Sequence, residues 1–332
     1  MFLAMHIPDG FLSVPTGLAL WVVTACVVGA ALSITREQLK ERQIPLLGMM
    51  GAFIFAAQAL NFPIAGGTSG HLLGATLATI VLGPWAATLV MTSVIATQGL
   101  LFADGGLLSM GANIFNMGIL GAFLGYALYR DLQRLGLPEH LATLIAAWIS
   151  VVAAATACSL ELALSGTTRL DVVLPAMVGV HLFLGLGEGV VTVAAVRTLK
   201  ASNLRYRLVG QHASTGEGGS VTPDLPPAAT GARVLGWGML VSLVLCLLSP
   251  LASTAPDGLA RVAERTGFSK KTRVATGIFA NYHVPFLNGG PSIITAMVTG
   301  TALIGAVALC LGYILTRSRQ HDCDENNVQA AP

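Results

Sequence analysis

The feature of this sequence that most limits its possible folds is a series of eight apolar stretches spread along 332 residues. Most are about as long as the roughly 20 residues that a helix needs to cross a bilayer. Only 10% of the residues are charged, whereas soluble domains carry about 25%. We therefore predict an all-α polytopic membrane protein, with apolar stretches at 17–35, 44–64, 72–101, 107–129, 141–164, 172–196, 234–251 and 293–316.

The stretch 72–101 is too long for one untilted crossing, because its ~30 residues would rise about 45 Å as a helix. Gly83-Pro84 lies near its middle. Proline lacks a backbone donor and restricts the residue before it, so these residues predict a tight turn between two helices. With this division the chain has about nine transmembrane helices.

The distribution of basic residues predicts the orientation. With nine crossings, an N-terminus outside and a cytoplasmic C-terminus, twelve of the 18 Lys and Arg residues lie in inner loops. Five of the other six lie in one long segment between the last two helices, and long loops count little in the positive-inside rule. Eight crossings would remove this bias. The chain is thus expected in the cell (inner) membrane, in contact with lipid and without a nucleic-acid partner.

Composition also predicts four regions. Residues 1–200 form a seven-helix unit, and 201–231, rich in Gly, Ser, Thr and Pro, form a flexible linker. Residues 232–318 form a two-helix unit with an outer segment at 253–292, and the polar tail 319–332 is expected to be disordered.

The N-terminal residues suggest a chelating site. If translation begins at Met5, its amine, the backbone nitrogen of His6 and the His6 imidazole can bind one metal ion in a plane through fused rings. A second imidazole could fill the remaining corner. Four nitrogens in a square favour Ni(II) or Cu(II). Because Phe2-Leu3-Ala4 precede Met5, this chelate requires the start at Met5.

His71 is the natural fourth ligand, since it follows the glycine-rich turn 66–70 at the outer end of two predicted helices. A solvated His6 and a His71 that only caps a helix are the simpler alternatives. An ionisable or amide side chain at membrane depth is a functional candidate by default. His181 and Glu188 lie two helical turns apart and could hold helices together or contact the metal, and Asn113 and Asn116 could bond between helices.

These motifs resemble the CbiM/NikM substrate-binding components of energy-coupling factor transporters. The resemblance rests on residues 5–12, 66–71, 111–118 and 181–188, in that order, and covers roughly residues 5–200. Residues 255–268 resemble the accessory NikN/CbiN-type component, here fused after the linker.

The resemblance implies that Met5, His6 and His71 bind Ni(II) or Co(II) as the transported ligand, with no resident cofactor. It also implies partners, namely a transmembrane coupling subunit and cytoplasmic ATPases. The sequence has no P-loop, so we expect a transporter subunit and not an enzyme. The small residues Ala25, Gly29 and Ser33 could form a packing face for the coupling subunit. The alternatives are a stand-alone secondary nickel or cobalt permease and an intramembrane metal-dependent hydrolase.

Overall fold

The computed structural model is a helical bundle and describes residues 6–64, 67–201, 228–273 and 276–329. Met5 and nearly all of the predicted linker 201–231 lie outside these residues. The described elements are α1 Val14–Gln38, η1 Glu41–Gln43, α2 Ile44–Gln58, β1 Phe62–Ile64, β2 Thr68–Gly70, α3 Ala75–Leu82, α4 Pro84–Leu101, α5 Met110–Asn113, η2 Ile114–Leu120, α6 Gly121–Arg134, α7 Glu139–Leu164, α8 Leu170–Ala201, α9 Ala228–Leu248, η3 Ser249–Leu251, α10 Gly258–Thr266, η4 Ser269–Lys271, η5 Ala280–Tyr282 and α11 Gly289–Gln329.

The described residues contain six helices that are long and apolar enough to cross a membrane. They lie at Val14–Gln38, Pro84–Leu101, Met110–Arg134, Glu139–Leu164, Leu170–Lys200 and Gly289–Ser318, with two shorter apolar helices at Ile44–Gln58 and Leu235–Leu251. Large apolar side chains on the outside, such as Phe183 and Trp237, are more than half exposed. Lipid would cover them in a bilayer, so the chain is a helical, multi-pass membrane protein.

The Gly83-Pro84 pair ends one helix and begins another, as the sequence predicts. Gly83 has a φ of 80°, a conformation that other residues rarely adopt, and Pro84 opens α4. However, α3 has only 8 residues, which rise about 12 Å. It therefore reaches partway into the bundle, and the count of nine full crossings stays a prediction.

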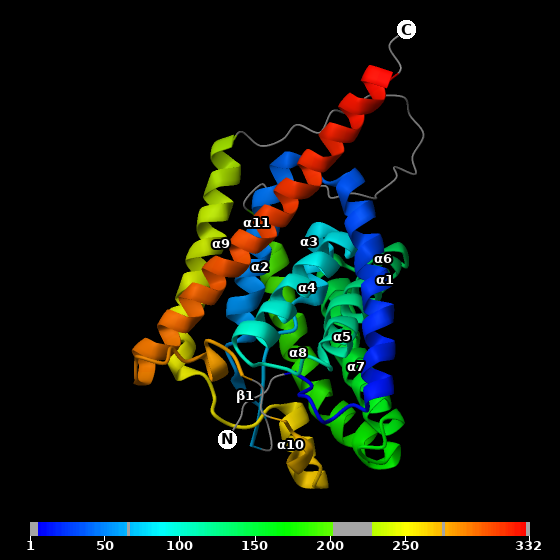
Figure 1. Ribbon diagram of the computed structural model, residues 1–332, viewed down its shortest axis with the longest axis vertical. Helices are drawn as coiled ribbons and strands as arrows, with labels where there is room; N and C mark the ends of the chain where they lie inside the picture. Colours follow the sequence, from blue (N-terminus) through cyan, green and yellow to red (C-terminus); the bar gives the residue numbers. More distant parts are fainter. Residues whose placement is uncertain (1–5, 65–66, 202–227, 274–275, 330–332) are drawn as a thin grey trace.

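The two ends of the described chain lie at opposite ends of the bundle (Figure 1). The N-terminal loop lies near β1, β2 and α10, whereas α11 finishes at the far end. Opposite ends require an odd number of passes through the bundle. Which end faces the outside is still a prediction from the charges.

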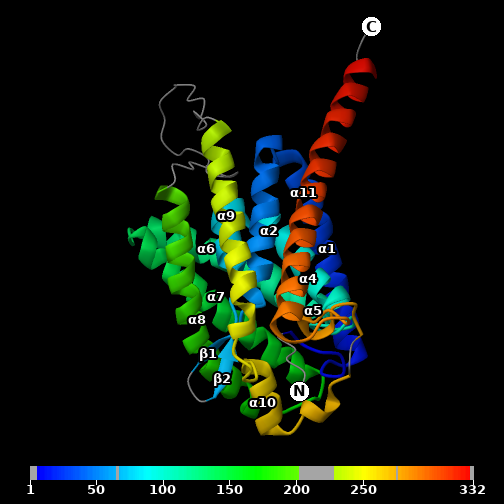
Figure 2. The same ribbon diagram turned by 90° about the vertical axis from the view of Figure 1, so that its left-hand side faces the viewer.

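The centre of the bundle is formed by α2, α3 and α4, whose apolar side chains are buried on nearly all sides. The C-terminal helices α9 and α11 pack against α2, and Figure 2 shows α2 between them. In the tail after residue 318, expected to be irregular, the backbone continues as helix α11 to Gln329.

Candidate metal-binding site

The N-terminal loop runs into the interior and is held there by main-chain contacts. The backbone of Ile7 is paired with the Asn113 amide, which accepts from Ile7 N at 2.9 Å and donates to Ile7 O at 3.1 Å. The Gly106 N–H also donates to Ile7 O. Residue 6 is therefore fixed by the residue that follows it, and the His6 side chain is buried.

Asp9 anchors the same loop to the turn before α5. Its carboxylate accepts hydrogen bonds from the backbone N–H groups of Leu107, Leu108 and Ser109 at 2.9–3.2 Å. These amides belong to the turn that leads into α5, and the carboxylate supplies the acceptors that they need when buried. The motif residue Asp9 thus positions the loop and does not face the His6 ring.

His71 follows the hairpin in which β1 pairs antiparallel with β2. A Cβ on Gly70 would lie 2.6 Å from side-chain atoms of Ile64 and Leu184, so glycine is needed for this close approach. Nδ1 of His71 lies 3.0 Å from Leu72 O. If Nδ1 carries the proton for this contact, Nε2 carries the lone pair that a metal needs.

Glu188 secures the backbone just after His71. Its two carboxylate oxygens accept from Leu73 N at 2.7 Å and from Gly74 N at 2.8 Å. The carboxylate therefore connects α8 to the loop that leads into α3. Glu188 thus supports the loop after His71, and it does not line the cavity next to His6 and His71 that is described below.

His6 and His71 meet in the interior of the protein. Their ring centroids are 5.9 Å apart, and they are 2% and 6% exposed. Both line a small cavity of about 70 Å³, which His181 also lines from α8. Metal–imidazole bonds are about 2 Å long, so one ion could lie between the two rings.

Asp104, which was not singled out from the sequence, has a buried carboxylate that lies next to His6. Asp104 Oδ1 lies 3.1 Å from Nδ1 of His6, and its Oδ2 accepts a hydrogen bond of 2.7 Å from the Tyr282 hydroxyl. Burial works to raise the pKa of Asp104, but His6 and Tyr282 outweigh burial, so this pKa is below its ordinary value. Asp104-Gly105-Gly106 reads as an exposed turn, and only the fold places it inside.

Residues 253–273 and 276–288 from the C-terminal part form a segment that we call the cover segment, which lies next to the two loops that carry His6 and His71. It binds the hairpin through Ser69, whose N–H donates to Pro256 O and whose hydroxyl donates to Ala255 O. It binds the N-terminal loop where Arg273 N donates to Asp9 O. Tyr282 belongs to it. The hairpin before His71 is thus bonded to residues more than 180 positions away in the sequence.

Asp257 from the cover segment also lines the cavity. Its carboxylate caps α10 by accepting from Ala260 N at 2.7 Å. Burial raises the pKa of Asp257 to about 7, although the Ala260 hydrogen bond lowers it. The adjacent Gly258 packs on His181, since a Cβ there would lie 2.9 Å from the imidazole Cε1.

The other residues singled out in the sequence lie around this centre. Asn116 donates to Glu161 at 2.8 Å and so joins the π-helical turn η2 to α7. Nδ1 of His181 lies 2.7 Å from Met177 O in its own helix. Asn113 and Asn116 therefore serve different partners, and Met5 lies outside the described residues.

Within the described residues, no three side chains of His, Cys, Asp or Glu come together as a metal site. A metal ion at His6 and His71 would therefore need further ligands from main-chain or terminal nitrogens.

Comparison with known families identifies the chain. Residues 6–206 match the model of CbiM, the cobalt uptake substrate-specific transmembrane region. This chain belongs to the CbiM family. Residues 232–317 match the PDGLE domain, which includes the cover segment and the Pro256-Asp257-Gly258-Leu259 sequence.

Relatives that join both parts in one chain have the same organisation as this CbiM-family protein. A protein of Archaeoglobus fulgidus assigned as fused nickel transport protein NikMN is 33% identical over 315 residues, covering 94% of this chain and 98% of its own. The fused nickel transport protein LarMN assigned in Lactiplantibacillus plantarum is 31% identical, covering 96% and 99%. A solved structure described as a transition metal transporter is 35% identical, with a TM-score of 0.56, over 62% of this chain and 100% of its own.

Proposed function

We propose that this CbiM-family chain is the metal-capture subunit of an ATP-driven importer of Ni(II) or Co(II), of the energy-coupling factor type, in the cell (inner) membrane. The observation that carries the proposal is the convergence of His6 and His71, from two separate loops, on one buried cavity. The charge distribution predicts that this end of the bundle faces outside, where an importer first meets its ion.

Four nitrogens would bind the ion: the Met5 amine, the main-chain nitrogen and imidazole of His6, and the imidazole of His71. The hydrogen bonds of Ile7 and Asp9 support this set of ligands. They hold the loop on the C-terminal side of His6 in place, and His6 is the residue that follows the amine-bearing Met5. A square of nitrogen donors favours Ni(II), so nickel is the preferred substrate in this proposal.

Metal binding in this mode requires the His6 ring to turn. A chelate ring that includes the His6 main-chain nitrogen can close only through Nδ1, the nitrogen nearest the backbone, and Nδ1 faces Asp104 at 3.1 Å. A half-turn about the Cβ–Cγ bond exchanges the two sides of the ring. Nδ1 then faces away from Asp104, and Nε2–H moves to the side of the carboxylate. Carboxylates commonly orient metal-binding histidines through such a hydrogen bond.

We further propose that the cover segment holds the loaded site closed. Its hydrogen bonds reach both loops that supply ligands, through Ser69 and Asp9. Three of its residues, Asp257, Gly258 and Leu259, also form part of the cavity wall. Tyr282 links this segment directly to Asp104, so closure and the orientation of His6 would change together.

The partners in this proposal are a transmembrane coupling subunit and cytoplasmic ATPases. On α1, the small residues Ala25, Gly29 and Ser33 are exposed, and a Cβ on Gly29 would meet nothing within 4 Å. They are therefore not used for packing within the described chain, and they leave a flat face against which another helix can lie closely.

The decisive experiment compares purified protein that begins at Met5 with protein that begins at Met1. Nickel and cobalt are measured by elemental analysis after loading and desalting. Stoichiometric metal in the Met5 form alone is expected, because four extra residues and a displaced amine prevent the fused chelate. Equal metal in both forms would contradict the amine as a ligand, and full affinity after acetylation of the Met5 form would contradict it independently.

A further inference from the structure

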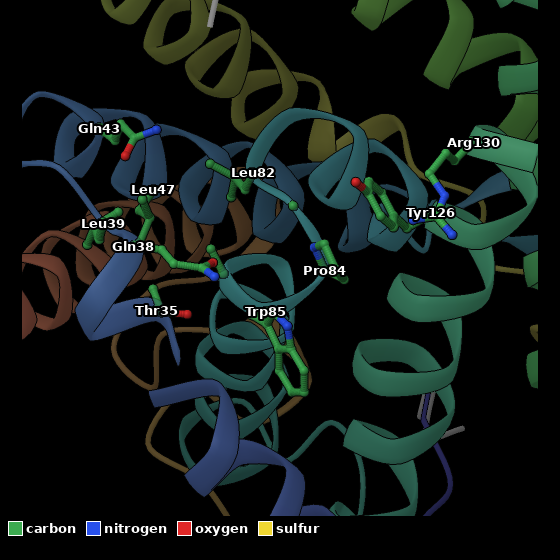
Figure 3. Close-up of a pocket in the computed structure, with 12 residues that line it drawn as sticks. Thr35, Gln38, Leu39, Gln43, Leu47, Leu82, Pro84, Trp85, Tyr126 and Arg130 are labelled. Atoms are coloured by element: carbon green, nitrogen blue, oxygen red, sulfur yellow. The ribbon is translucent and has the colours of Figure 1, made fainter. Parts of the chain in front are cut away.

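A second cavity lies at the end of the bundle opposite His6, around the turn between α3 and α4. Its volume is about 220 Å³, well above the roughly 10–15 Å³ that one water molecule requires. It is bounded by the end of α1, the start of α2, the α3–α4 turn and α6. In Figure 3, Thr35 and Gln38 face Pro84 and Trp85, with Tyr126 and Arg130 on the other side.

The cavity combines the N-terminus of α4 with hydroxyl and amide side chains that can donate or accept hydrogen bonds. Pro84 has no N–H, and the next two amides of α4, those of Trp85 and Ala86, have no partner within the helix. The residue before the helix is Gly83, which has no side chain to cap them. The N-terminus of this 18-residue helix also carries partial positive charge. Among the described lining residues, Arg130 has the only full charge and none has a carboxylate; the nearby Asp131 lies 3.6 Å from Arg130 Nε outside the lining.

Thr35 supplies an independent sign of a missing partner. The residue is 3% exposed, and its hydroxyl has no hydrogen-bond partner among the described residues. Threonine hydroxyls within helices usually donate to the carbonyl one turn earlier, as Thr88 and Thr92 do here. A buried hydroxyl without a hydrogen-bond partner destabilises the folded protein. Because this hydroxyl lies at the cavity, an atom of a bound ligand could supply the missing hydrogen bond.

We propose that this cavity binds a phosphate group, supplied by the headgroup of an anionic phospholipid. A phosphate oxygen accepts from helix N-terminal amides, from a hydroxyl and from a guanidinium, which are the donors present. Its lipid source follows from the surroundings. Leu39 and Leu82 give the cavity an apolar wall, and Trp85 and Tyr126 are the aromatic types that gather at membrane interfaces. The positive-inside distribution places this end in the cytoplasm, where anionic lipids attract basic residues.

The test uses the full-length protein and native mass spectrometry after exposure to phosphatidylcholine vesicles with or without phosphatidylglycerol. We expect one retained phosphatidylglycerol in preference to phosphatidylcholine. Arg130→Gln should lower retention roughly tenfold, because a charge-assisted hydrogen bond is lost. Thr35→Val, which keeps the shape of the side chain, should lower it about threefold.

Arg134→Gln is the matched control, since Arg134 lies one turn further along α6 and pairs with the same Asp131 as Arg130, but is not among the residues that line the cavity. It removes the same charge and should leave retention unchanged. Equal retention in wild type and Arg130→Gln would overturn the proposal. Displacement of the lipid by inorganic phosphate at millimolar concentration would support the phosphate site and overturn the lipid as its source.

A further measurement distinguishes a protein occupant of the cavity from a lipid. If Arg130→Gln impairs assembly with the coupling subunit while lipid retention is unchanged, the cavity is a protein contact and the lipid proposal is overturned. Nickel binding is measured on the same samples and should be equal in all of them. Failure of this proposal is thereby distinguished from failure of the metal site, which lies at the other end of the bundle.

Discussion

The two ends of the bundle differ in the kind of polar group that they present. At the His6 end, a cavity of about 70 Å³ is lined by imidazoles, which bind cations through their lone pairs. At the Gly83 end, a cavity of about 220 Å³ is lined by the N-terminus of α4, by hydroxyl and amide side chains and by Arg130, and the helix N-terminus and the guanidinium both attract anions. The cover segment forms part of the wall of the smaller cavity, and the larger cavity lies at the turn between α3 and α4. In our proposals, the first end takes one metal ion and the second takes a larger anionic group.

The largest expected effect that separates the two ends is the loss of nickel binding when one imidazole is removed. His6→Ala or His71→Ala should weaken nickel binding by more than about 100-fold, since loss of even an outer-shell partner costs 10–100-fold. Isothermal titration of the Met5-start protein measures this. His140→Ala is the control, because His140 is exposed on α7. Unchanged affinity in both His6→Ala and His71→Ala would refute the assignment of the metal site.

The contact between the N-terminal loop and the cover segment can be tested at Gly10. It has a φ of 94°, and a Cβ there would lie 2.0 Å from Lys271 O. Gly10→Ala should lower the free energy of unfolding by about 2–3 kcal/mol, from backbone strain and displacement of the cover segment together. Gly136→Ala should cost only about 1 kcal/mol, because Gly136 has a φ of 85° and open space around it. Equal thermal shifts in detergent would contradict this contact.

Substitution of Asp104 tests whether nickel affinity depends on residues that are not themselves proposed ligands. Asp104→Asn should weaken nickel binding about 10–100-fold through loss of the carboxylate that orients His6. Tyr282→Phe should weaken it less, by about threefold, since only one neutral donor is removed. Tyr313→Phe, at an exposed tyrosine on α11, serves as the control. A higher affinity in Asp104→Asn would mean that this carboxylate competes with the metal for Nδ1.

The smallest expected change concerns the face of small residues on α1, which is part of neither cavity. Gly29→Leu on α1 should leave nickel affinity unaltered and reduce assembly with the coupling subunit about threefold to tenfold, as a close helix contact is lost. Co-purification with the coupling subunit measures this. Gly179→Leu on α8 adds the same side chain at another open helical glycine and should change nothing. Equal effects of both substitutions would rule out a specific face on α1.

The helices of this protein could be predicted from the sequence because each one depends on local properties. Apolar length and few charges predict a membrane helix wherever they occur, and Gly83-Pro84 predicts a break whatever surrounds it. His6 and His71 were also recognisable as candidates, since an imidazole beside a possible N-terminus or after a glycine-rich turn is informative by itself. The Asn116 amide was predicted to bond between helices, and in the structure it joins η2 to α7.

The residues around the candidate ligands became visible only in the tertiary structure. Asp104 reads as part of a solvated turn, and Tyr282 as part of a long outer loop, yet they meet across 178 positions in the chain. Thr35 and Arg130 are ordinary residues near helix ends until α1, α4 and α6 enclose a cavity between them. The physical reason is range: hydropathy and turn preferences act between neighbours in sequence, whereas burial, the pairing of polar groups and the shape of a cavity depend on which distant segments pack together.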